Sequence, residues 1–84
     1  MRDGIFTYYS VVCSDHWALM NSLMHMHISF EYHAKRPGNA VCYIDFVLDK
    51  DRDPAYWEIE YDCKKFWERK GVNGHIEVLN TYEL

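Results

Sequence analysis

The sequence predicts an α+β fold in which a four-stranded antiparallel sheet carries two helices on one face. Strand-like composition or alternation of apolar and polar residues is found at residues 5–13, 24–33, 41–48 and 75–84. Helical spacing of apolar residues is found at residues 15–24 and 53–70. The order is therefore β-α-β-β-α-β, and right-handed crossovers give the strand order 4-1-3-2.

The size and composition of the chain restrict what it can be. Its 84 residues predict one domain, residues 1–84, and 49% hydrophobic and 17% aromatic residues can fill its core. The net charge of −4 argues against charge-driven attraction to nucleic acid or anionic lipid. Three cysteines without a C-x-x-C pair indicate reduced thiols. With no signal peptide and no long apolar span, we expect a cytoplasmic protein without a membrane segment.

The first strand and the first helix follow from local signals. The segment "IFTYYSVVC" (5–13) has apolar groups in both alternating sets, which predicts a strand in the middle of the sheet. Ser14 and Asp15 then offer N-cap oxygens to a short helix that ends near Met24. Its expected apolar stripe consists of Trp17, Met20 and Met24, with Leu19 and Leu23 beside it.

The next two strands are predicted to form a hairpin around "KRPGN". In the first, Met24 to Tyr32 alternate with a polar set that contains His25, His27 and His33. A loop at residues 37–39 would place Phe30 opposite Phe46, but also Glu31 opposite Asp45, which is unfavourable. A loop at residues 36–38 avoids that pair but needs a helical Arg36 before a proline. Both registers remain open.

The second half of the chain predicts a long helix and a last strand. Asp53 is expected to cap a helix that Pro54 opens and that ends at Lys70, before Gly71. The segment "HIEVLNTYEL" (75–84) alternates, so it predicts a strand with Ile76, Val78 and Tyr82 on one face. The expected buried stripe of the helix is Tyr56, Ile59, Cys63 and Phe66. The whole is the ferredoxin-like arrangement.

Metal and cofactor sites are not predicted. The histidines from His27 to His33 would span roughly 20 Å along a strand, too far for one ion. The segment "DKDRDPAYWEIE" (49–60) has acids at positions 1, 3, 5 and 12, the spacing of an EF-hand loop. However, Pro54 stands where that loop needs glycine, so we interpret it as a strand-to-helix connection.

Enzyme motifs are also missing. The sequence has no G-x-S-x-G, no phosphate-binding loop and no signature that pairs a cysteine with a histidine. Cys13 and His16 are neighbours in sequence, which does not establish a catalytic geometry. We therefore predict a protein that is not an enzyme, with no catalytic residues.

One alternative is binding of single-stranded nucleic acid. The segment "NAVCYIDF" (39–46) resembles in part the RNA-recognition motif, which has this element order and stacks bases on aromatic residues of its central strands. Phe6 and Tyr43 match stacking positions, whereas Val41 stands where an aromatic residue belongs. The resemblance implies binding to short RNA or single-stranded DNA. Asp45 on the same face opposes the phosphates, so nucleic acid is the less favoured partner.

The favoured interpretation is a protein-binding surface. Helices are expected on one face only, so the other face would present tyrosines and valines to a partner or to a second copy in a homodimer. Which set of the first strand contributes, Phe6 and Tyr8 or Ile5, Tyr9 and Val11, stays open. Acidic residues beside an exposed aromatic pair would favour a basic partner. The residues expected to contact it are Val41, Tyr43, Val47, Asp49, Asp51, Trp57, Glu58 and Tyr61.

At the level of protein class, the chain resembles the compact acidic inhibitors that phages encode, anti-CRISPR proteins among them. The resemblance lies in the small size, in the acidic cluster "DKDRD…EIEYD" and in the missing catalytic motifs. It implies inhibition by steric occupation of a basic site on a partner, in the cytoplasm of a host cell.

Overall fold

The fold has one antiparallel sheet and a layer of helices. The computed structural model describes residues 5–34 and 42–84. Its elements are β1 (Phe6–Cys13), α1 (His16–His25), β2 (Phe30–His33), β3 (Tyr43–Asp49), α2 (Tyr56–Tyr61), α3 (Cys63–Arg69) and β4 (Ile76–Glu83). The strand order is β2-β3-β1-β4, which is the expected order read from the opposite edge. The α+β class is confirmed, but the described residues contain three helices where we predicted two.

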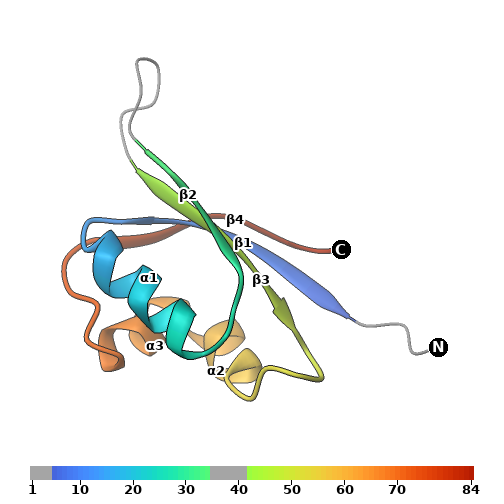
Figure 1. Ribbon diagram of the computed structural model, residues 1–84. Coiled ribbons are helices and arrows are strands. Elements are labelled where there is room, and N and C mark those ends of the chain that lie inside the picture. The colour runs from blue at the N-terminus through green and yellow to red at the C-terminus, as the bar shows by residue number, and fades with distance from the viewer. Residues whose placement is uncertain (1–4, 35–41) are drawn as a thin grey trace.

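Strand β1 lies inside the sheet, because it pairs with both β3 and β4. Its two apolar faces predicted this position. The three helices lie on the same side of the sheet (Figure 1), and the core fills the space between. The largest fully buried side chains of this core are Trp67, Phe46, Phe66, Leu19, Leu23, Ile44, Leu48, Ile59, Val11 and Val72.

The predicted long helix is divided at Asp62, so its continuity was wrong. Asp62 has extended backbone angles (φ −154°, ψ 91°), and its carboxylate accepts a hydrogen bond from the Lys65 amide at 3.1 Å. The residue therefore caps α3 in the middle of the expected helix. Asp53 does not act as the predicted cap, since its carboxylate accepts the Asp49 amide (2.7 Å) in the preceding turn. Gly71, with φ +89°, ends α3 as predicted.

The strand predicted from Met24 onward was also wrong over its first half. Asp15 caps α1 as expected, and the helix runs through His25, so β2 begins only at Phe30. His27 follows with φ +57°, its amide donates to the Met24 carbonyl, and the Ile28 amide donates to the Leu23 carbonyl. Both Leu23 and Ile28 are buried, so this turn keeps two core side chains in place.

The buried face of α1 differs from the expected stripe. Leu19, Met20 and Leu23 are buried, whereas Trp17 is 69% and Met24 60% exposed. Because successive helical residues turn by about 100°, these two side chains lie on a different face from the buried set. Burying the leucines against the sheet therefore leaves Trp17 and Met24 outside.

The register of the hairpin is the one that pairs Phe30 with Phe46 and Glu31 with Asp45. The loop between its strands, at residues 35–41, lies outside the described residues. In β4, the pairing with β1 shifts between Ser10 and Val11. Because of this bulge, Tyr82 lies opposite Tyr8 and not on the face of Ile76, which corrects the predicted common face.

None of the described helices is both long and apolar enough to cross a membrane.

Candidate functional site

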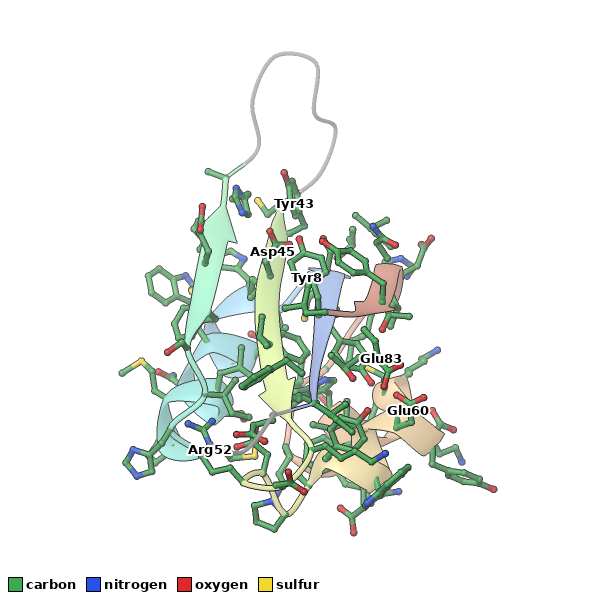
Figure 2. The ribbon with its side chains drawn as sticks, turned by 90° about the vertical axis from the view of Figure 1, so that its right-hand side faces the viewer. Tyr8, Tyr43, Asp45, Arg52, Glu60 and Glu83 are labelled. Atoms are coloured by element: carbon green, nitrogen blue, oxygen red, sulfur yellow. The ribbon has the colours of Figure 1, made fainter. Side chains whose placement is uncertain are left out.

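The face of the sheet opposite the helices is one candidate surface. Figure 2 shows Tyr8, Tyr43 and Asp45 on this side of β1 and β3, and no other described segment crosses it. The half-buried Val47 follows the same alternation as Tyr43 and Asp45 along β3. This decides the question left open for β1, because Tyr8 and not Tyr9 points outward, while Tyr9 is buried in the core.

The aromatic rings of this face stack on one another. Tyr8 stacks on Tyr82 with the ring centroids 4.7 Å apart, and His33 stacks on Tyr43 at 4.5 Å. Ser10 is only 6% exposed, although it lies on the side of β1 away from the helices. Part of the apolar area that we expected a partner to cover is therefore covered by side chains of the same sheet.

His33 contacts both Glu31 and Asp45, the two carboxylates that the register places opposite each other. Its Nε2 lies 3.0 Å from Asp45 Oδ2 and 3.5 Å from Glu31 Oε1. The imidazole is thus hydrogen-bonded to Asp45 and lies close to the Glu31 carboxylate. The other oxygen of Asp45, Oδ1, is buried and has no hydrogen-bond partner among the described residues. A shallow hollow of about 300 Å³ adjoins this carboxylate and is lined also by Tyr8 and Glu31.

Tyr8 shares the environment of that carboxylate. Burial raises the pKa of Tyr8 to about 12, and the nearby Asp45 carboxylate adds to the shift. The phenol therefore stays protonated at neutral pH and can act only as a neutral hydrogen-bonding group.

The second candidate surface lies on α2. Trp57 is 60% and Tyr61 92% exposed, and the two are four residues apart, so they share one side of the helix. Glu58 is exposed beside them. The Lys50 Nζ lies 4.8 Å from the centroid of the Trp57 ring, a cation–π contact. This surface therefore combines large aromatic area with negative charge and already holds one cation.

A cleft of about 370 Å³ separates α2 from the edge strand β4. Glu60 and Glu83 line it from the two sides, and Figure 2 shows them close to each other. The Tyr9 hydroxyl donates a hydrogen bond to Glu60 Oε2 at 2.8 Å, which fixes this carboxylate at the cleft wall. The Lys50 and Trp57 side chains line the same cleft, so it extends the α2 surface toward the sheet.

The predicted contact residues are thus divided between two surfaces. Tyr43 and Val47 lie on the open sheet face, Trp57, Glu58 and Tyr61 lie on α2, and Val41 is outside the described residues. Asp51 is exposed in the turn before α2. Asp49 accepts hydrogen bonds from the amides of Asp51 and Arg52, so its carboxylate has a structural role in that turn.

Sequence reasoning missed the cleft and the bridging role of His33. The cleft could not be anticipated, because the position of its β4 residues depends on a bulge in the pairing with β1. No sequence signal predicts that bulge. The bridge had a signal, since His33 is the diagonal neighbour of Asp45 in the register that pairs Glu31 with Asp45.

No set of three or more His, Cys, Asp or Glu residues within residues 5–34 and 42–84 is arranged to hold a metal ion. In the segment that resembles an EF-hand loop, Asp53 is 6% exposed and its carboxylate is bound by Arg52 at 2.8 Å. Glu60, at the last position of that loop, accepts the Tyr9 hydroxyl. Both carboxylates are therefore engaged within the protein.

No protein-family model matches the chain. Searches among curated proteins and among solved structures likewise found no similar protein. Any functional assignment therefore depends on the chemistry of the two surfaces described above.

Proposed function

We propose that this protein is a small, non-enzymatic interaction module that inhibits or regulates a partner protein by occupying a basic site on it. The observation that carries the proposal is the exposed pair Trp57 and Tyr61 on α2, with Glu58 beside them. Aromatic anchors next to charged residues are typical of the energetic centres of protein interfaces. On this proposal the fold is a ferredoxin-like one whose second helix is divided, and the protein acts in the cytoplasm.

The chemistry of α2 favours a partner with exposed lysine or arginine side chains. The Lys50 ammonium on the Trp57 ring is an internal example of the contact that such a side chain would make. Glu58 and the cleft residues Glu60 and Glu83 supply carboxylates around this ring. An acidic surface also steers a basic partner toward the complex and disfavours phosphate groups.

Nucleic acid is the second candidate, since Tyr8 and Tyr43 occupy the open sheet face as they would in an RNA-binding sheet. Two features weaken it. Asp45 lies between these rings, and each ring is already stacked, on Tyr82 and on His33 respectively. A base would have to displace these contacts or stack on the remaining ring faces.

The proposal is tested by titrating the protein with a synthetic nona-arginine peptide as a defined basic probe, by calorimetry at low and moderate salt. We expect the peptide to bind, with an affinity that falls as salt rises. The double reversal Asp51→Lys, Glu58→Lys should weaken binding about tenfold or more, because both charges become repulsive. Trp57→Ala should weaken it by a similar factor, since the cation–π partner is lost.

The control is Glu77→Lys, compared with Glu58→Lys alone so that each variant reverses one exposed carboxylate; Glu77 lies on β4, outside the cleft. It should change affinity by less than about threefold, the effect of a distant surface charge. If Glu77→Lys weakens binding of the peptide as much as the reversals near α2 do, the attraction is nonspecific and the proposed surface is wrong. Tight binding of a uridine oligonucleotide that is lost in Tyr43→Ala would favour the nucleic-acid alternative instead.

A further inference from the structure

Helix α1 has an exposed face that is unusually apolar. Trp17 and Met24 are 69% and 60% exposed, and they are separated by seven residues, which is two helical turns. Seven residues correspond to about 10.5 Å along the axis and return to nearly the same side of the helix. Asn21 is exposed between them. The three side chains therefore form one stripe that faces away from the core.

No charged residue interrupts this stripe. The ten residues of α1, "HWALMNSLMH", contain no Asp, Glu, Lys or Arg, although 26% of the whole chain is charged. The imidazole of His16 extends the patch: it stacks on Tyr32 at a centroid distance of 5.0 Å and lies tilted beside Trp17 at 5.5 Å. A helix face that is meant only for solvent normally carries charged residues.

We propose that this face binds a second copy of the protein, with two α1 helices packed antiparallel around a twofold axis near Asn21. In that arrangement Trp17 of each copy lies against Met24 of the other, because the two positions are equally distant from the middle of the helix. The contact occurs twice and joins a thioether to an indole ring, which is a favourable pair. Asn21 of the two copies meets at the axis, where an amide can both donate and accept a hydrogen bond.

A second copy fits this face better than a charged partner does. The acidic residues that would attract a basic protein lie on α2, whereas the carboxylate next to α1, that of Asp15, accepts the Ala18 amide as the helix cap. Two copies with a net charge of −4 each repel one another, so they should associate where neither presents charge. The charge-free face of α1 meets that condition.

The exposed area indicates a weak dimer. Large aromatic side chains cover about 150–250 Å² each, so the exposed parts of Trp17, Met24 and Tyr32 would remove roughly 300–400 Å² from water per copy. This is about half of the ~800 Å² that each partner contributes to an interface of standard size. We therefore expect a dissociation constant on the order of 100 μM, in the range of transient complexes.

Sedimentation equilibrium of the full chain, from about 10 μM to about 1 mM, measures this association across the expected constant. The average mass should rise from that of the monomer toward that of the dimer. Trp17→Glu and, independently, Met24→Lys should weaken association at least tenfold, since each places two charges in the symmetric interface. Amide NMR spectra of both variants establish that the fold is retained.

Matched controls locate the interface. Trp57→Glu changes a tryptophan of similar exposure on α2, and Tyr43→Glu changes the open sheet face; both should leave the dissociation constant within about twofold, as expected for distant sites. In a mixture of methionine-methyl-labelled and unlabelled protein, an intermolecular NOE should join the Met24 methyl to the Trp17 ring. A monomer at the highest concentration, a dimer that survives Trp17→Glu, equal loss in a control variant or a missing NOE would each overturn the proposal.

Discussion

Replacing His27 by glycine should stabilise the protein. His27 follows the C-terminus of α1 with φ +57°, a left-handed conformation that costs an L-residue about 1–2 kcal/mol. The two hydrogen bonds that close this turn come from backbone amides of His27 and Ile28, so they do not need the imidazole. The α3 helix ends with the same pair of bonds, but there Gly71 occupies the left-handed position. The molecule thus contains both versions of one motif.

The expected gain is the difference between two effects. Glycine removes the left-handed penalty of about 1–2 kcal/mol, and it adds about 0.5–1 kcal/mol of backbone entropy loss on folding. The two ranges together give a rise of about 0–1.5 kcal/mol in the free energy of unfolding of His27→Gly, with a central value of about 0.75 kcal/mol. For a domain of this size, the central value corresponds to roughly 3–6 °C in melting temperature.

Urea denaturation followed by circular dichroism measures this change. Gly71→Ala is the reciprocal variant and should lower stability by about 1 kcal/mol, since a Cβ there meets no atom within 4 Å and only the backbone conformation is penalised. His25→Gly, at the last residue of α1, should destabilise by about 0.5–1 kcal/mol. If His27→Gly is neutral or destabilising, the His27 side chain has a stabilising role that outweighs the backbone strain, and the reasoning fails.

Two further predictions concern the buried Asp53 and the half-buried Tyr8. Asp53→Ala should lower the free energy of unfolding by about 2–3 kcal/mol in urea titrations, because it leaves the Asp49 amide without its acceptor and Arg52 without its partner; an unchanged midpoint would refute this. Because the pKa of Tyr8 is raised, the folded state keeps the phenol proton at pH values where the unfolded chain loses it. The contribution of Tyr8 to the free energy of unfolding is therefore complete below pH 10 and is lost as the pH rises from 10 to about 12. In Asp45→Asn the phenolate of Tyr8, followed by carbon-13 NMR, should form at lower pH, though burial, the larger cause, would keep the pKa of Tyr8 above 10; no change would exclude the carboxylate as a cause.

The sheet was predictable because its signals are local and repeated. Alternation in residues 43–49 places Ile44, Phe46 and Leu48 in the core, and a slip by one residue would expose all three. The pattern therefore determines which face is buried. It does not distinguish the two registers left open, which differ by two residues, and the structure has the one that pairs Phe30 with Phe46. The central position of β1 followed for a similar reason, from apolar residues on both of its faces.

The errors occurred where two patterns fit the same residues. The alternation of methionine and histidine from Met24 to His27 is compatible with a strand, but Leu23 and Ile28 are buried by continuing the helix and closing it with a left-handed residue. Histidine gives no signal for that conformation, which glycine usually adopts. Asp62 lies inside the single long helix that we predicted to end at Lys70, whereas its carboxylate caps a new helix.

The candidate site shows how local compensation changes the expected function. The register places Glu31 against Asp45 on the open sheet face, a pair that the sequence analysis considered unfavourable. His33 occupies the diagonal position, hydrogen-bonds Asp45 and lies 3.5 Å from Glu31, so both carboxylates already have a polar neighbour within the sheet. No comparable compensation covers Tyr61, which is 92% exposed on α2, or Trp17 on α1. The two exposed helix faces differ in chemistry: Glu58 gives α2 a negative charge beside its aromatic residues, whereas α1 contains no Asp, Glu, Lys or Arg. This difference is the reason why we propose a basic partner for α2 and a second copy for α1.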